Sequence, residues 1–354
     1  MRDMVAPTIV QQRLRRSCRH AEERRRDAKP PAPSGCPLHA VAATASADAG
    51  PSYRRPFWVG QNRRVRDEIA RLDARRDCQR IVFLLAAYEF PFDTTRALEL
   101  ALFHTYGSRS VSRLLDRTGQ FTGHGQKRYD DTNLLIAHFV ESGWDGDLGA
   151  RAIARMNWIH GHYRIPNDDL LFVLWTFIDF PIRWMEAFGW RAFTPHERSA
   201  WFNYWIGIGE RMGITGLPAT REEFDAFVAG YEAREFVFDE ASRRTADATV
   251  AVMAGWLPQP LRGLVRPVAA CLARPQFRRA VGYPDPPPLL EAAIRGALRV
   301  RALIKRAVSF ERYPDLLIDR RQRSYPGGTP AIEAIGPDVL QRTKRTQTPP
   351  QDPR

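Results

Sequence analysis

Apolar residues from about residue 58 onward recur at intervals of three and four, in successive stretches that Gly or Pro residues separate. This spacing is typical of amphipathic helices. Strand-like alternation is scarce, and no Asn-Gly or Asp-Gly pair joins two strand-like segments. The sequence therefore predicts an all-α fold, a single large multi-helix bundle. The predicted helices cover residues 65–76, 79–88, 94–104, 111–118, 126–140, 148–164, 168–188, 195–212, 221–233, 238–256 and 289–308.

The two ends of the chain differ from this helical part. Residues 1–57 are rich in Arg, Ala, Pro and Ser and poor in periodic apolar residues, so burial there would not offset the entropy of ordering. We predict a disordered leader over residues 1–57, a helical catalytic domain over 58–322 and a C-terminal extension over 323–354, which opens with the polar stretch "RSYPGGTP".

The formal net charge of +13 would indicate nucleic acid or an anionic membrane as a partner if it lay on a folded face. Much of the charge lies in the leader instead, since residues 1–30 hold nine Lys or Arg against four acidic residues. We therefore expect no nucleic-acid partner and at most weak association with a membrane surface.

Several features favour a cytoplasmic protein. The most apolar run, residues 170–190, carries Asp179, Arg183 and Glu186, and charges in hydrocarbon are costly, so the run predicts a buried core helix rather than a membrane span. No signal peptide is predicted, because no unbroken apolar segment follows the first charges. The four cysteines are far apart and form no C-x-x-C pair, which argues against a disulfide framework and a zinc site.

Two histidines, His160 and His162, lie in the predicted helix of "ARMNWIHGHYRIPNDDL". Residues i and i+2 are about 200° apart around a helix, so this pair cannot bind one metal ion from the same face. His160 shares the apolar side with Ile153 and Met156, whereas we expect His162 to face solvent. Two interpretations of His160 stay open here: a core histidine satisfied by a hydrogen bond, which periodicity alone favours, and an axial ligand of a haem iron.

The helix before it, in "GQKRYDDTNLLIAHFV", has a stripe that starts polar and becomes apolar. Arg128, Asp131, Thr132, Leu135 and Phe139 are predicted to share one face. Such a stripe suits a pocket with a charged mouth and an apolar floor. Local pairing of the Asp residues with Arg128, or with the helix dipole, explains the same pattern.

Other motifs limit the chemistry. The sequence has no E-x-x-H, H-E-x-x-H, P-loop or G-x-S-x-G motif. Gly207, Gly209 and Gly213 follow no strand, so we expect them to allow close helix packing rather than to bind a nucleotide. In "IPNDDLL", Asn167 is predicted to be an N-cap, and Asp168 and Asp169 are interpreted as first-turn acids.

The stretches "GQKRYDDT", "ARAIARMNWIHGHY", "IPNDDLLFVLWTFIDFPIRWMEAFGWRAFTPHE" and "YWIGIGERMGI" occur in an order and spacing that resemble one family. This family joins the rubber oxygenases (latex clearing proteins) to the fungal MpaB oxygenases, and the likeness, from about residue 58 to about residue 329, is closest to the fungal branch. The resemblance implies a haem b pocket and an oxygenase that uses dioxygen to oxidise or cleave a small hydrophobic substrate, such as a prenyl or terpenoid chain.

The resemblance also implies residue roles. His160 would be the proximal iron ligand, and Arg128 and Thr132 would lie on the distal side, near dioxygen. Rubber oxygenases carry a Lys directly before this Thr that can take the sixth iron position, where this chain has Asp131. Because a carboxylate cannot mimic an amine ligand, we do not expect polyisoprene cleavage, and we predict that Asp131 orients water or acts as a base.

Three further residues are candidates for binding the haem: Arg164 and Arg155, which would pair with its propionates, and Asn157. We assign His196, in "FTPHE", to a helix start rather than to the iron. The competing hypothesis is a non-catalytic helical protein that binds haem or lipid. Nucleic-acid binding through the leader is a second competitor.

Overall fold

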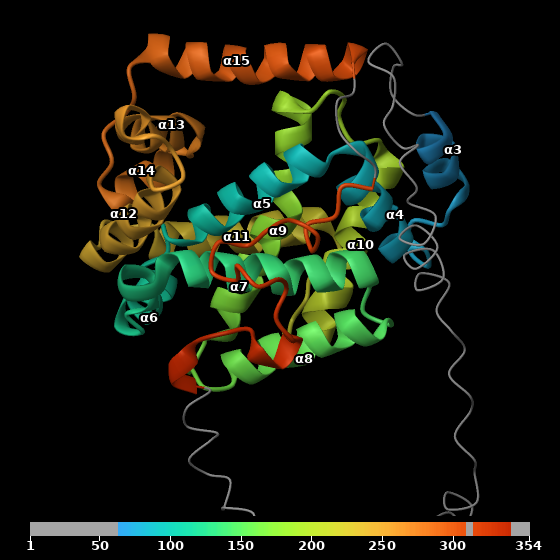
Figure 1. Ribbon diagram of the computed structural model, residues 1–354, viewed down its shortest axis with the longest axis horizontal. Helices are drawn as coiled ribbons and strands as arrows, with labels where there is room; N and C mark the ends of the chain where they lie inside the picture. Colours follow the sequence, from blue (N-terminus) through green and yellow to red (C-terminus); the bar gives the residue numbers. More distant parts are fainter. Residues whose placement is uncertain (1–62, 309–313, 341–354) are drawn as a thin grey trace, which may run out of the picture.

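The computed structural model describes residues 63–308 and 314–340, and all regular structure within these ranges is helical (Figure 1). The predicted all-α fold is therefore confirmed, whereas the predicted leader and residues 341–354 of the extension lie outside the described residues. The α-helices are α3 (Arg63–Arg71), α4 (Cys78–Leu84), α5 (Pro91–Thr105), α6 (Arg109–Arg117), α7 (Gln120–Ser142), α8 (Asp147–His160), α9 (Asn167–Phe188), α10 (Pro195–Arg211), α11 (Arg221–Glu235), α12 (Glu240–Ala254), α13 (Val265–Leu272), α14 (Pro275–Val281) and α15 (Pro288–Ala307). A π-helical turn, η2 (Leu85–Glu89), and two 3-10 turns, η3 (Gln259–Leu264) and η4 (Ile332–Ala334), complete the set.

Helix α9 is buried in the middle of the bundle, because it is apolar nearly all round. It packs most extensively against α5, and also against α10 and α11. From α10, Trp201 Nε1 donates to the Phe177 carbonyl over 3.0 Å, and the Trp205 ring stacks on the Phe177 ring at 4.8 Å between centroids. The predicted buried core helix is thus confirmed. Among the described helices, none combines the length and apolarity that a membrane span requires.

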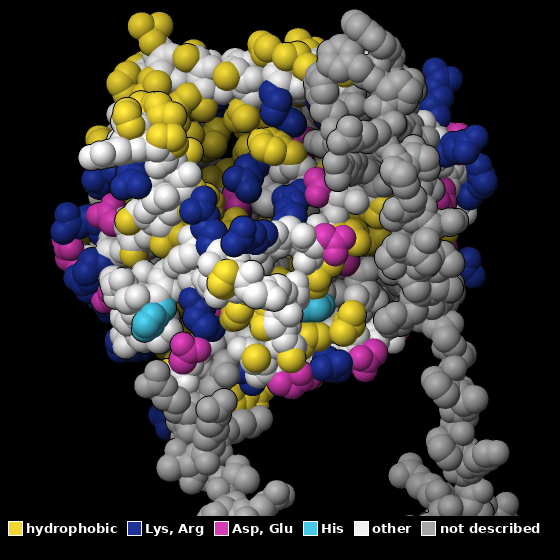
Figure 2. Space-filling view, in the orientation of Figure 1, with side chains coloured by type: hydrophobic (Ala, Val, Ile, Leu, Met, Phe, Trp, Pro, Cys, Tyr) yellow, Lys and Arg dark blue, Asp and Glu magenta, His cyan; other side chains and the backbone are white. Residues whose placement is uncertain are grey.

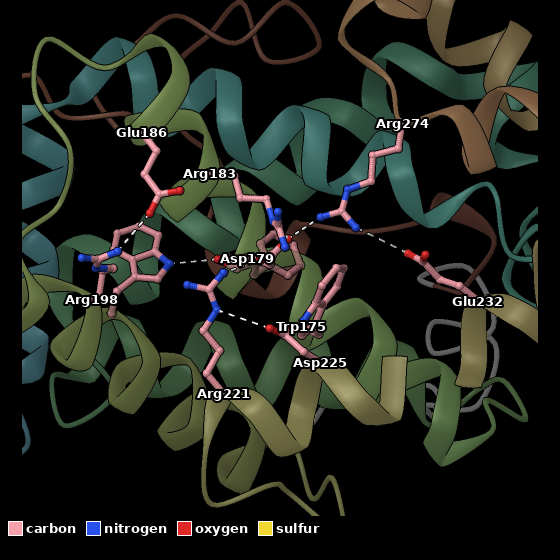
Figure 3. Close-up of polar contacts among 11 residues, drawn as sticks. Trp175, Asp179, Arg183, Glu186, Arg198, Arg221, Asp225, Glu232 and Arg274 are labelled. Carbon is pink, nitrogen blue, oxygen red and sulfur yellow. Dashed lines mark hydrogen bonds and ion pairs between the residues drawn. The ribbon is translucent and has the colours of Figure 1, made fainter. Parts of the chain in front are cut away.

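Asp179, on α9, is fully buried among three arginines (Figure 3). Arg183, one turn further along α9, donates to its carboxylate over 2.7 Å, and Arg221, the first residue of α11, donates over 2.6 Å. Arg274, directly before α14, donates to the same carboxylate. This network ties the central helix to α11 and to the start of α14.

The C-terminal segment 314–340 lies beside α7 and α8 (Figure 1). Its residues Ile332 and Ile335 are buried in the main core. Arg151 of α8 pairs with both carboxylate oxygens of Glu333, at 2.8 and 2.9 Å. The described part of the predicted C-terminal extension is therefore packed onto the bundle.

Two helix starts show how local sequence sets the boundaries. The predicted helix start at His196 is confirmed: Thr194 and Glu197 form a capping box, each side chain accepting the backbone N–H of the other. Asn167 is not the predicted N-cap but the first residue of α9. Its side-chain amide instead donates to the Thr215 carbonyl and accepts from the Thr215 backbone N–H, each over 2.9 Å.

Other helix boundaries differ from the prediction. The helix predicted over 65–76 ends at Arg71, because the Asp73 carboxylate accepts the backbone N–H groups of Arg75 and Arg76 and forms a turn. Helices α13 and α14 were not predicted, since 8 and 7 residues are too few to show clear periodicity.

Glycines in α10 and after it have two different roles. A Cβ on Gly207 would lie 2.6 Å from the Trp144 ring, and a Cβ on Gly209 would lie 2.6 Å from Leu174, so both allow the close packing that we predicted. Gly213 differs, because its φ of +72° lets the chain turn directly after the helix, where no neighbour limits the space.

Candidate functional site

A cavity lies inside the bundle, between α5, α6, α7, α8, α9, α10 and α12. Its walls are mainly apolar, and the side chains that line it include Ile136, Phe139, Met156, Phe177 and Trp205. A small number of polar groups, among them His160, Arg128 and Thr132, also face it. Apolar walls with a few polar groups are typical of sites for a hydrophobic ligand or cofactor.

His160 is the last residue of α8, and its side chain lines the cavity. Burial, assisted by the like charge of Arg128, lowers the pKa of His160 to about 4, so the imidazole is neutral at pH 7. No hydrogen bond joins this ring to another residue within the described part of the chain. The ring therefore faces the cavity, where a ring nitrogen lone pair can bind a ligand.

His162 faces solvent, as we predicted. Its side chain is exposed, and Nδ1 lies 2.7 Å from the Trp158 carbonyl oxygen. The two histidines therefore face different surroundings, as their spacing indicated.

Arg128 and Thr132 are neighbours on α7 and line the same cavity as His160. Arg128 Nη1 donates to Thr132 Oγ1 over 2.8 Å, and Thr132 Oγ1 donates to the Arg128 carbonyl over 2.9 Å. The guanidinium also lies 5.8 Å from the centroid of the Phe121 ring. The Thr132 hydroxyl thus holds the Arg128 side chain in one orientation at the cavity wall.

Asp131 does not line the cavity, in contrast to our expectation. Its buried carboxylate accepts from Lys127 Nζ over 2.9 Å and from the Tyr325 hydroxyl in the C-terminal segment. Asp131 and Thr132 are about 100° apart around the helix, and the cavity lies on the Thr132 side. Leu135, expected on the same face, is also buried outside the cavity lining. This arrangement gives no support to a distal role for Asp131.

The three other candidate haem-binding residues also lie outside the cavity lining. Asn157 Nδ2 donates to the Arg211 carbonyl over 2.8 Å. Arg155 is buried, packs over Trp158 and donates to the Ile335 carbonyl over 2.7 Å. Arg164 is exposed. The first two side chains hold helices and the C-terminal segment together instead.

Two buried acidic groups in the cavity wall were not predicted as site residues. Asp169, interpreted as a capping acid, accepts from Ser110 Oγ over 2.7 Å and from the Tyr231 hydroxyl over 2.6 Å, and burial raises its pKa. Glu99 of α5 accepts from the Tyr129 hydroxyl, and burial likewise raises its pKa. The available signal was an acidic residue inside the apolar run "RALELALF" for Glu99. No such signal was available for Asp169, because helix capping explains an acidic residue in a first turn equally well.

The fold and the cavity together define a class: an all-helical protein whose apolar cavity presents one neutral imidazole and one arginine. Residues 97–304 match the family model described as "ER-bound oxygenase mpaB/B'/Rubber oxygenase, catalytic domain". The chain belongs to this family, which confirms the resemblance seen in the sequence.

Three fungal proteins illustrate the relationship. The chain is 32% identical over 243 residues to "ER-bound oxygenase mpaB'" of Penicillium brevicompactum. This aligned region covers 64% of this chain and 57% of that protein. It is 32% identical over 216 residues to "ER-bound oxygenase mpaB" of Penicillium roqueforti (strain FM164), covering 56% and 72%. It is 34% identical over 187 residues to "ER-bound oxygenase mpaB" of Penicillium brevicompactum, covering 48% and 48%. The chain thus spans between about half and three quarters of the length of these relatives.

Proposed function

We propose that this chain is a haem b-dependent oxygenase that uses dioxygen to oxidise or cleave a small hydrophobic substrate of the prenyl or terpenoid kind. The observation that carries the proposal is that His160 of α8 and the Arg128–Thr132 pair of α7 line one apolar cavity. Membership of an oxygenase family supports the reaction class. Cytoplasmic localisation, with at most peripheral contact with a membrane, stays a prediction.

The residues of the cavity fit a haem. A haem iron takes a neutral imidazole as axial ligand, and burial keeps His160 neutral without a hydrogen bond to another described residue. The apolar walls suit the faces of a macrocycle that is itself largely apolar. When bound, the haem would supply the redox chemistry that activates dioxygen.

Arg128 would stabilise negative charge that develops on oxygen during the reaction. A guanidinium is a cation that presents several N–H donors in a fixed plane. Thr132 acts as a positioning residue for it, because the Thr132 hydroxyl accepts from Arg128 Nη1 and uses its own proton on the Arg128 carbonyl. The same positive charge beside His160 opposes protonation of the imidazole.

The substrate would be bound by apolar contact. Side chains from α8, α9 and α10, such as Met156, Val173 and Ile208, give a surface that suits a prenyl chain and excludes water. The same walls also suit a protein that binds a hydrophobic ligand without oxygen chemistry. Haem content separates the oxygenase from a lipid-binding protein, and dioxygen-dependent turnover separates it from a non-catalytic haem-binding protein.

The experiment is the visible absorption spectrum of the full chain purified from haem-supplemented cells, with a pyridine haemochrome assay for stoichiometry. We expect a strong Soret band and about one haem b per chain, as a single axial ligand implies. His160→Ala should lose the haem while its circular dichroism stays helical. The matched control His162→Ala should keep it, because the His162 side chain is exposed. A wild type that stays colourless after reconstitution, or haem retained in His160→Ala, would contradict the proposal.

A further inference from the structure

Helix α15 exposes its apolar face. Leu289, Val300, Leu303 and Ile304 have between 51% and 87% of their surface exposed. With the small residues between them, such as Ala293, they cover an arc of about 140° around the helix that contains no charged residue. A stripe of this kind usually faces a protein core.

The opposite face of α15 turns inward and is mixed: Ala302 is buried and Leu298 packs against the main core, beside basic side chains. Arg301 donates to the carboxylate of Asp93, a fully buried residue of α5. Lys305 is buried, and burial lowers its pKa to about 8. The helix is therefore attached to the bundle through this mixed face, which includes the ion pair with Asp93, and its apolar stripe is left at the surface.

A neighbouring element extends this apolar surface. α13 packs against α15, and the turn η3 directly before α13 exposes Leu261 and Leu264. Figure 2 shows hydrophobic side chains gathered along the edge of the molecule formed by α15 and, at its left end, α13. We call the exposed residues Leu261, Leu264, Leu289, Val300, Leu303 and Ile304 the α15 surface.

The charge around the α15 surface is positive. Two of the five basic residues of α15, Arg301 and Lys305, turn inward, and a third, Arg295, pairs with the only acidic residue of the helix. The segment from η3 through α13 adds Arg262 and Arg266 and no acidic residue, and Arg266 pairs with Asp247 of α12. Arg299 and Arg306 are exposed along one border of the stripe. Arginine next to an apolar stripe can extend its guanidinium to lipid phosphates while its stem stays in apolar surroundings.

We propose that the α15 surface docks on an anionic lipid bilayer, with α15 lying in the plane of the interface. An amphipathic helix with apolar residues on one face and basic residues at its border binds such a surface through both burial and charge. A second copy of the chain fits less well, because a symmetric contact would bring the same cationic border against itself. None of the residues of the α15 surface lines the cavity, so the docking does not depend on haem or turnover.

The test is sedimentation of the full chain with vesicles of phosphatidylcholine alone and with roughly 30% phosphatidylserine, because anionic lipid attracts basic residues near the surface. The double variant Leu303→Gln/Ile304→Gln removes apolar side chains that are already exposed, so it should fold. We expect wild type to bind the anionic vesicles. The affinity of the double variant for the same vesicles should be at least about tenfold lower. The control Val339→Gln, an exposed apolar residue elsewhere, should bind as wild type does.

Three outcomes would overturn the proposal. The first is wild type that does not bind anionic vesicles. The second is a double variant that binds as strongly as wild type, which would assign the binding to another basic segment, such as residues 1–57. The third is a wild-type dimer in light scattering that the double variant converts to a monomer, which would make a second copy the occupant of the α15 surface.

Discussion

Replacing Asp179 by Asn tests whether the buried ion network of α9 stabilises the fold around the cavity. Removing one partner of a buried ion pair typically costs about 3–5 kcal/mol. The cost here should be lower, because Arg183, Arg221 and Arg274 keep 57%, 28% and 24% of their side-chain surface exposed. Two of them also have a second acid at 3.8 Å, Asp225 for Arg221 and Glu232 for Arg274. We therefore expect a loss of about 2–3 kcal/mol in the free energy of unfolding.

This loss converts to a measurable melting shift. An unfolding entropy of about 2.1 cal/mol/K per residue gives about 0.6 kcal/mol/K for a domain of roughly 270 residues, so Tm should fall by about 3–5 °C. The assay is a thermal melt by circular dichroism at pH 7. Asp147→Asn is the matched control, since Asp147 pairs with Arg151 at 3.1 Å on the surface and such pairs contribute at most about 1 kcal/mol. A shift for Asp179→Asn that is no larger than the control's would refute the reasoning.

Two further predictions concern the cavity. Arg128→Ala should keep the haem and lower kcat/KM for dioxygen-dependent turnover by about 10²–10³-fold, because a preorganised donor is lost. The control is Arg164→Ala, which removes an exposed arginine. Full turnover in Arg128→Ala would exclude the proposed stabilisation of negative charge by Arg128. The haem-free protein should lose stability as pH falls from about 6.5 to about 4, because the unfolded imidazole takes up a proton before the buried ring of His160 does. Urea unfolding across this window should show a smaller loss in His160→Ala, and an equal loss would mean that His160 does not carry the effect.

The sequence predicted the part of the site that depends on spacing within one helix. Arg128 and Thr132 are four residues apart, and the helical repeat alone brings them to one face. The same repeat puts His160 on the apolar side of its helix, with Ile153 and Met156. The expected position of Asp131 on the cavity face differs from the structure, because a helical wheel does not show where a face ends. The partners that hold its carboxylate away from the cavity include Tyr325, which is 194 residues further along the chain.

Helix α15 shows the same limit for the fold. The period of its apolar residues predicts a helix but not which side turns inward. Rotating it to bury Leu303 and Ile304 would gain about 1–1.5 kcal/mol for the exposed part of each side chain. The same rotation would take Arg301 away from the buried carboxylate of Asp93, and leaving a buried charge unpaired costs about 3–5 kcal/mol. The Arg301–Asp93 pair, together with the burial of Leu298 and Ala302 on the same face, therefore favours the observed orientation. The apolar stripe remains at the surface, where an apolar phase outside the chain can bury it.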